Sequence, residues 1–456
     1  MKRILLALSC ILALAVSCNY FAVQEPDNPD VPDNPDTPSG EDPDDGNNDV
    51  TPVLSIDYKA VDSLRIASKD FPYWAYDTTL AYSNIILNTL LNKCIVRNDA
   101  MQGFMATESG STTPSWGYWN YIIHYTSKDA SGKDVTLSER VVFPAGFDFS
   151  HSPRGIALIN HPTIGANREC PTVDKDYLMG LAAKDYVAVF PDLLGFGVSQ
   201  ERVHPYLCEE LTARTTLDGV LAAQRFLSDR GITLRNEGLV NVGYSQGGAS
   251  ALAVHKYVET RSTDAERDQV HLRASYCGGG PYDLIATWDS YKQADVLSFP
   301  AVLPMTILGL KEGFPQEMKD IDLYDCFSEA VREKGFLEYI VSKKYPVTLL
   351  NAHLKLAVGS TRMSDILSPA MQDETTDLAK TVRSLLERNN LITGWAPGIP
   401  VHLYHEKYDD VVPYVNMEKA LKGLAGGVVL TINPILSGGS HVGGAGIFYL
   451  QIMEEL

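Results

Sequence analysis

The five residues Gly243-Tyr244-Ser245-Gln246-Gly247 have the spacing of a nucleophilic serine held on a sharp turn. The apolar run at 238–242 predicts a short buried strand, and the small residues at 248–254 predict a helix packed closely against it. Side chains at the two glycines would collide with such a turn. The same letters also occur in glycine-rich loops with an ordinary serine, so the flanking strand and helix carry the prediction.

A base and an orienting acid for this serine are found later in the chain. Residues 399–405 predict a strand, and residues 406–413 predict the acidic loop that leaves its carboxyl end. A further strand at 428–433 leads to His441, the only histidine after the acidic loop. Because a serine hydroxyl is a weak nucleophile, it needs a general base that a carboxylate orients. Asp409 and Asp410 are the two candidate acids.

The order of these motifs resembles the α/β-hydrolase superfamily. Gly-x-Ser-x-Gly is followed by Asp-x-Val-Val-Pro and then by Gly-Ser-His before a predicted terminal helix. Within the superfamily, residues 115–456 are similar to the secretory lipase group typified by fungal lipase A. The resemblance implies a mostly parallel central sheet with helices on both faces, and it assigns Ser245, Asp409 and His441 as nucleophile, acid and base. Asp410 is the alternative acid.

Two further positions are expected to bind the oxyanion of the reaction. The backbone N–H of Gln246 begins the helix after the serine, where the helix dipole favours negative charge. The resemblance places a second donor after the strand predicted at 154–160, and we expect the backbone N–H of Thr163 or Ile164 to provide it. His161, at the start of that loop, is expected to brace it rather than to act in catalysis. Asp192, in an Asp-x-x-Gly-x-Gly turn, is expected to be structural.

The remaining pattern predicts the alternation of a doubly wound sheet. Residues 119–125 and 137–143 predict an antiparallel hairpin at the sheet edge, residues 185–190 and 272–277 predict strands, and residues 212–230 predict a helix. A long helical insertion, about 284–397, is expected to form a cap over the site. Its apolar stretch at 298–310 either lines an acyl pocket or forms the core of the cap. Residues 80–87 suggest a helix in a region without a recognisable pattern.

The N-terminal 52 residues predict export and a tether. Residues 1–18 have the basic start and short apolar run of a secretory signal, which is too short to remain as a membrane span. The small residues before Cys18 resemble a bacterial lipobox, which implies lipidation of Cys18 and anchoring at the cell envelope; ordinary signal cleavage is the alternative. Residues 19–52 are rich in proline and aspartate and cannot bury enough apolar surface to fold. Residues 53–456 then form the catalytic domain.

Charge and cysteine content bear on nucleic-acid binding, disulfide formation and cofactor binding. The formal net charge of the chain is −19, and ten acidic residues and no basic ones lie in residues 19–50. No basic patch suggests nucleic-acid binding. Five cysteines follow Cys18, so an odd number leaves at least one thiol unpaired; Cys277 is the expected buried one, and a Cys170–Cys208 disulfide is an open alternative. No spacing suggests a metal site or a phosphate-binding loop, so we expect no cofactor.

These observations predict a serine carboxylic ester hydrolase, of esterase or lipase type, that acts through an acyl-enzyme on a small-molecule or lipid ester. One alternative is a serine exopeptidase of the same fold, for which Glu329 or Glu333 could bind a free amine. The other is a surface protein that only binds, although such a protein would have no reason to retain Ser245, Asp409 and His441 together. The sequence leaves the oligomeric state open.

Overall fold

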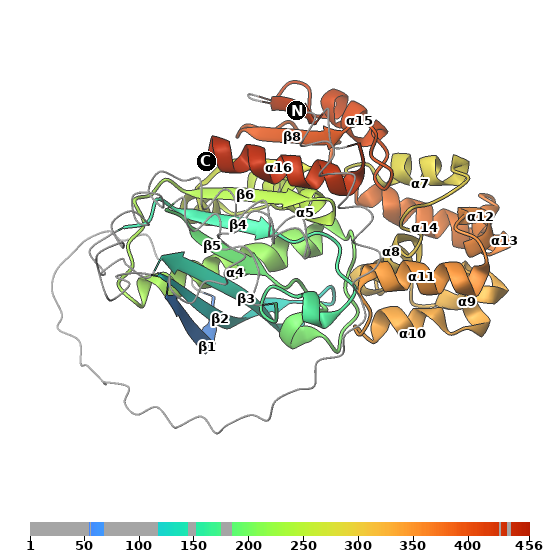
Figure 1. Ribbon diagram of the computed structural model, residues 1–456, viewed down its shortest axis with the longest axis horizontal. Coiled ribbons are helices and arrows are strands. Elements are labelled where there is room, and N and C mark those ends of the chain that lie inside the picture. Colours follow the sequence, from blue (N-terminus) through green and yellow to red (C-terminus); the bar gives the residue numbers. More distant parts are fainter. Residues whose placement is uncertain are drawn as a thin grey trace, which may run out of the picture.

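The structure is a computed structural model that describes residue 54 and residues 56–67, 117–144, 152–174, 185–427, 430–435 and 439–456. The described chain forms a nine-stranded sheet in the order β1-β2-β3-β5-β4-β6-β7-β8-β9 (Figure 1). The strands are β1 Tyr58–Ala67, β2 Gly117–Lys128, β3 Asp134–Pro144, β4 Ile156–Asn160, β5 Val187–Pro191, β6 Leu239–Tyr244, β7 Leu272–Gly278, β8 Val401–Glu406 and β9 Leu430–Ile435. The signal, the tether and the helix expected at 80–87 lie outside the described residues.

The six strands β4 to β9 are mutually parallel, whereas β1, β2 and β3 join them through antiparallel pairs. Short apolar runs such as β4 and β5 are buried along their whole length, as expected for parallel strands covered on both faces. The predicted α/β-hydrolase fold is therefore confirmed.

From β5 onward, one or more helices follow each strand. They are α4 Glu209–Ser228, α5 Gln246–Thr260, α6 Asp264–Val270, α7 Leu284–Gln293, α8 Val302–Gly313, α9 Glu329–Glu333, α10 Phe336–Val341, α11 Val347–Val358, α12 Met363–Ile366, α13 Pro369–Gln372, α14 Asp377–Arg388, α15 Val415–Gly423 and α16 His441–Glu455. None of the helices in the described ranges combines the length and apolar character needed to span a membrane.

The sheet is covered on both faces. Alternate residues of β4 separate into two apolar clusters, with Ile156 and Leu158 in one and Ala157 and Ile159 in the other. The first cluster includes the apolar residues of α4, α5 and α15, and the second includes those of α16. The period-two alternation of a strand thus supplies a core on each side.

The hairpin formed by β2 and β3 is present, but it is not at the sheet edge. β1 pairs with β2 antiparallel along its whole length and takes the edge position. The sequence does not reveal β1, because its alternation of apolar and polar residues is irregular, and its pairing with β2 shifts register between Ala60 and Asp62. A strand that must accommodate a bulge has no clean period-two pattern.

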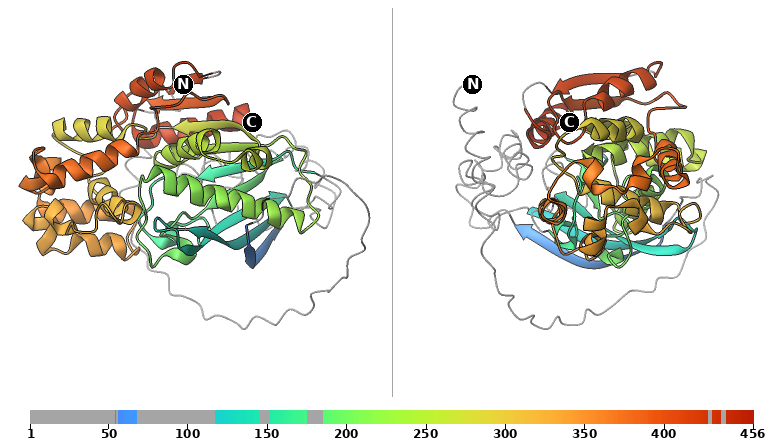
Figure 2. Two further views of the ribbon diagram at one scale, coloured as in Figure 1. Left: turned by 180° about the vertical axis from the view of Figure 1, so that it is seen from behind. Right: turned by 90° about the vertical axis from the view of Figure 1, so that its right-hand side faces the viewer.

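Helices α7 to α14 all lie between β7 and β8 in the chain, and they gather at one end of the sheet (Figures 1 and 2). They share an apolar cluster of their own, to which Tyr206 and Cys208 also contribute. The apolar stretch at 298–310 contributes both to the core of the helical insertion and to the wall of a cavity. Ile307, Leu308 and Leu310 of α8 are buried in this cluster, whereas Val302 and Leu303 also line a cavity of about 410 Å³.

The four cysteines in the described part of the chain are buried and free. The Cys170–Cys208 disulfide is therefore not formed, and Cys277 is buried in β7 as expected. Burial raises the pKa of each of these thiols, which keeps them protonated and unreactive.

Asp192 organises the loop after β5. Its carboxylate accepts hydrogen bonds from the Ser138 hydroxyl at 2.5 Å, the Thr172 hydroxyl at 2.5 Å and the Thr172 N–H at 2.9 Å. Burial nevertheless raises the pKa of Asp192 to about 6. Burial also raises the pKa of Glu139, whose carboxyl oxygens have no hydrogen-bond partner among the described residues.

The raised pKa of Asp192 predicts that the free energy of unfolding depends on pH. Because the folded-state pKa of Asp192 lies above its unfolded value near 4, its stabilising contribution is complete below pH 4 and declines as the pH rises through about 6. The loss is on the order of 3 kcal/mol. Urea unfolding at pH 4 to 7 should show that Asp192→Asn becomes more stable relative to wild type as the pH rises. A difference in unfolding free energy that is constant with pH would contradict this assignment.

Candidate active site

Ser245 lies at the corner between β6 and α5, with backbone angles φ 62° and ψ −125°. A positive φ at a residue other than glycine is strained and must be held by its surroundings. A Cβ atom at Gly243 would lie 2.0 Å from the Gly247 carbonyl oxygen, and one at Gly247 would lie 2.2 Å from the Asn160 carbonyl oxygen. The two glycines of the motif therefore allow β6, α5 and the end of β4 to approach closely. Ser245 is thereby held on a sharp turn at the carboxyl end of β6.

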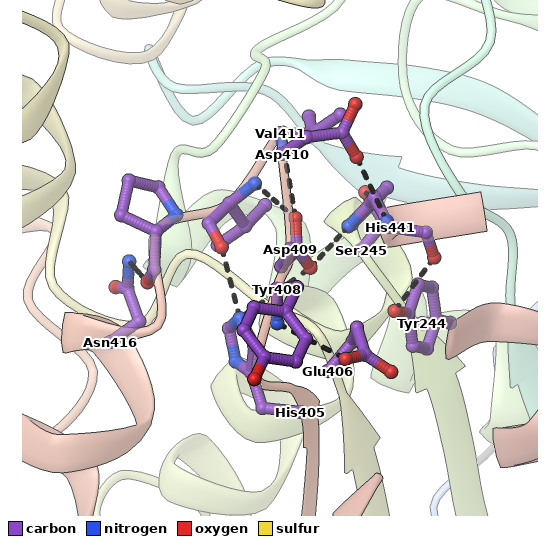
Figure 3. Close-up of polar contacts among 12 residues, drawn as sticks. Tyr244, Ser245, His405, Glu406, Tyr408, Asp409, Asp410, Val411, Asn416 and His441 are labelled. Carbon is purple, nitrogen blue, oxygen red and sulfur yellow. Dashed lines mark hydrogen bonds and ion pairs between the residues drawn. The ribbon is translucent and has the colours of Figure 1, made fainter. Parts of the chain in front are cut away.

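The structure brings the three predicted residues Ser245, His441 and Asp409 into one chain of hydrogen bonds (Figure 3). The Ser245 hydroxyl lies 2.8 Å from His441 Nε2, and His441 Nδ1 lies 2.6 Å from Asp409 Oδ2. Since a carboxylate only accepts, Nδ1 carries the proton and Nε2 is free to accept one from the serine. The Ser245 residue is 8% exposed and the Asp409 side chain is fully buried, so water competes little for these contacts.

Asp409 is oriented by the loop that follows β8. Its Oδ1 accepts the backbone N–H groups of Val411 at 2.9 Å and Val412 at 2.7 Å. His405 Nε2 lies 3.5 Å from Asp409 Oδ2 and 3.0 Å from the Val412 carbonyl oxygen, to which it donates. Burial lowers the pKa of His405, so this ring braces the loop as a neutral group. The carboxylate is thereby held with Oδ2 directed at the imidazole.

Asp410, the alternative acid, does not contact the imidazole ring. Its Oδ1 accepts the backbone N–H of His441 at 3.0 Å, while the Tyr244 hydroxyl donates to the His441 carbonyl oxygen at 2.9 Å (Figure 3). The Tyr244 ring also lies 5.1 Å from the His441 ring, between centroids. Asp410 and Tyr244 therefore hold the backbone of His441 from both sides. The sequence analysis assigned no role to Tyr244, although it lies within the serine motif.

The loop after β4 lies beside the serine. Thr163 lines the same cavity as Ser245 and Gln246, and its hydroxyl lies 2.9 Å from the hydroxyl of Tyr206. Ile164 instead lines a separate small cavity, which favours Thr163 of the two candidates. Further along, Glu169 accepts the N–H groups of both Gly165 and Ala166 at 3.0 Å, which secures the loop.

His161 is buried at the start of this loop, where its two ring nitrogens contact the carbonyl oxygens of Pro162 at 2.7 Å and Asp192 at 3.1 Å. Burial lowers the pKa of its ring. With both nitrogens directed at backbone carbonyls, His161 connects the loop after β4 to the loop after β5. This geometry fits the bracing role expected for it.

A second histidine, His204, holds the side chain of Gln246. His204 Nδ1 donates to the Leu194 carbonyl oxygen at 2.7 Å, and its Nε2 lies 2.6 Å from the Gln246 side-chain nitrogen. Burial lowers the pKa of His204 to about 3, so the ring is neutral and Nε2 accepts from the Gln246 amide. The sequence analysis missed this contact, because no local pattern relates residues 204 and 246.

We expect His204→Ala to lower kcat by about tenfold with little change in KM, because loss of the contact to the Gln246 side chain should displace, rather than remove, the backbone N–H that is expected to bind the oxyanion. His204→Gln, which keeps an acceptor group, should recover most of the rate. Steady-state hydrolysis of a p-nitrophenyl ester measures both parameters. An equal loss in both variants, or a change in KM alone, would argue against this positioning role.

The site opens into a cavity of about 410 Å³. The sheet side and the helical insertion both contribute to its wall, and the lining contains no aspartate, glutamate, lysine or arginine among the described residues. The sheet side provides Pro162, Thr163, Tyr206, Leu207, Tyr244, Ser245, Gln246, Pro281, Val411, Val412, His441, Val442 and Ala445, and the insertion provides Leu284, Thr287, Trp288, Tyr291, Phe299, Val302, Leu303, Thr306, Val347 and Leu386. Glu329 and Glu333, considered above as ligands for a free amine, are not in this wall. Nor do the described residues include a cluster of histidine, cysteine and acidic side chains able to hold a metal ion.

Comparison with known proteins relates this geometry to a family. The profile of the secretory lipase family matches residues 170–444, which is more than half of the chain. A search of curated proteins finds no match.

Solved structures resemble the fold at low sequence identity. The rice cell wall degrading esterase LipA from Xanthomonas oryzae is 22% identical, with 88% of this chain and 95% of LipA covered and a TM-score of 0.63. A hydrolase from Legionella pneumophila is 17% identical, with coverages of 88% and 98% and a TM-score of 0.66. Candida antarctica lipase A is 14% identical, with coverages of 72% and 73% and a TM-score of 0.54. At these identities the likeness supports the fold, and the family match goes further: the chain belongs to the secretory lipase family and is a carboxylic ester hydrolase.

Proposed function

We propose that the protein hydrolyses carboxylic esters through an acyl-enzyme on Ser245, with His441 as general base and Asp409 as the acid that orients it. The observation that carries the proposal is the continuous hydrogen-bond chain from Ser245 Oγ through both ring nitrogens of His441 to Asp409. The alternation of donor and acceptor along that chain is the arrangement that removes a proton from a serine hydroxyl.

The reaction proceeds in two halves. Ser245 Oγ attacks the ester carbonyl carbon while its proton passes to His441 Nε2, and the resulting oxyanion is bound by the backbone N–H groups of Gln246 and Thr163. The bond to the alcohol oxygen then breaks, and His441 returns the proton to the leaving alcohol. In the second half, water loses a proton to His441 and attacks the acyl carbon. The bond from that carbon to Ser245 Oγ then breaks, and His441 returns the proton to Oγ, which releases the carboxylic acid and restores Ser245.

The cavity favours an ester with an apolar acyl group over a peptide substrate. An exopeptidase that binds a free amine needs a carboxylate near the scissile bond, and the lining within the described chain contains none. The apolar lining instead suits a hydrocarbon chain, because burial of apolar surface stabilises the complex.

The test compares two substrate classes and locates the reactive residue. Wild-type enzyme should hydrolyse p-nitrophenyl butyrate and leave aminoacyl p-nitroanilides intact. A fluorophosphonate probe should label a single peptide, the one that contains Ser245, as determined by mass spectrometry. Hydrolysis of the anilides, or labelling at another serine, would contradict the proposal.

We also propose that the protein is exported and anchored to a membrane of the bacterial cell envelope through a lipid on Cys18. The proposal depends on the short apolar signal, the small residues before Cys18 and the acidic tether that follows. Metabolic labelling with a palmitate analogue should mark the wild-type protein and not Cys18→Ser, and the variant should leave the membrane fraction. Equal labelling of both proteins would exclude Cys18 as the anchor.

A further inference from the structure

Trp288 lies between two cavities. Its side chain lines the cavity of about 410 Å³ that contains Ser245, and it also lines a second cavity of about 240 Å³. Both buried apolar residues and charged residues line the second cavity. The apolar ones include Met371, Ala379 and Val382, and the charged ones are Lys292, Glu374, Lys380, Arg383 and Glu387. Trp288 is 6% exposed, and among the described residues it is the one that lines both of these cavities.

Helix α14 runs past both cavities. Leu386 lines the cavity with Ser245, whereas Val382, one turn earlier on the same face of the helix, lines the second cavity. The two cavities therefore follow one another along α14, with Trp288 of α7 as the residue that they share.

The position of Trp288 is held on both sides by contacts of α7. Tyr291 donates to the Val411 carbonyl oxygen at 2.8 Å, which connects α7 to the loop of Asp409. Asp289 accepts two hydrogen bonds from Arg383 of α14, at 2.8 and 3.0 Å. These contacts on either side of Trp288 fix the position of the helix that carries it.

We propose that Trp288 ends the acyl-binding cavity and sets the upper limit on acyl-chain length, which makes esters of short and medium acyl chains the substrates. This inference depends on the proposed function. A cavity of about 410 Å³ must hold the ester group, part of the alcohol and the acyl chain, so the acyl chain that fits in it has a limited length.

The experiment measures kcat/KM for p-nitrophenyl esters from acetate to palmitate in the full domain. Up to the limit, each added methylene should raise kcat/KM by about fourfold, because each buried methylene adds a similar transfer free energy. In wild type the rise should stop at a chain length between those of acetate and palmitate. In Trp288→Ala it should continue for several more carbons, since the second cavity then joins the first, and Trp288→Phe should shift the limit by less.

Two further variants separate this role from a general effect of mutation. Trp395→Ala removes a tryptophan that lines neither cavity and should leave the limit where it is in wild type. In the Trp288→Ala background, Ala379→Phe fills the second cavity and should return the limit toward that of wild type.

The possible outcomes distinguish this inference from the proposed function. Ser245-dependent hydrolysis with the same chain-length limit in wild type, Trp288→Ala and Trp288→Phe would overturn the inference alone. Absence of Ser245-dependent hydrolysis in wild type at every chain length would overturn the proposed function and this inference with it.

Discussion

Ser245→Ala should lower kcat for p-nitrophenyl butyrate by about 10⁶-fold, which brings the rate close to that left by binding and the oxyanion donors alone. The variant loses the only oxygen that lies within hydrogen-bond distance of His441 Nε2 among the described residues. Because Ser245 Oγ attacks the substrate and contributes little to its binding, KM should change far less than kcat. Initial rates with purified wild type and variant, at several substrate concentrations, measure both parameters.

Ser250→Ala is the matched control for this experiment. Ser250 is also buried in α5, but it lies outside the cavity that contains Ser245. The control should retain nearly all of the wild-type kcat. A Ser245→Ala variant with more than one-hundredth of the wild-type rate, free of contaminating enzyme, would mean that another residue is the nucleophile.

The second large effect is expected from Asp409→Asn and not from the same substitution at the neighbouring Asp410. Asp409→Asn should lower kcat by about 10⁴-fold, because an amide no longer selects the tautomer of His441 that accepts the serine proton. Asp410→Asn should cost about tenfold or less, since the amide oxygen can still accept the backbone N–H of His441. The comparison uses the same ester assay, with thermal unfolding of each variant to show that it is folded.

The reverse order of effects would assign the orienting role to Asp410 and contradict the hydrogen bond from His441 Nδ1 to Asp409. Equal and small effects of the two substitutions would instead mean that neither carboxylate is needed to orient the imidazole.

The sequence predicts the sheet and the central residues of the site because their determinants are local. The elbow needs glycines beside Ser245, and the parallel strands need short apolar runs, so both are visible in a few consecutive residues. The strand predicted at 238–242 overlaps β6, and the helix predicted at 248–254 lies within α5, which is longer at both ends.

The features that the sequence analysis missed depend on contacts between distant segments. His204 meets Gln246 across 42 positions in the chain, and Tyr244 meets the His441 backbone across 197. The different partners of Asp409 and Asp410 depend on the turn after β8, which adjacent letters do not reveal. The Cys170–Cys208 pairing was open from the sequence alone, and the free thiols exclude it.

The division of the cavity wall between the sheet side and the helical insertion has a consequence for how this enzyme can evolve. Leu284, Trp288, Val302, Leu303, Val347 and Leu386 line the cavity and belong to the cluster of the helical insertion, whereas Ser245 and His441 are carried by the sheet and its helices. Substitutions in the insertion can therefore reshape the substrate cavity while the strands that align the reacting groups stay as they are. Selection for activity on a new ester can therefore change the helical insertion without changing the residues that carry out the reaction.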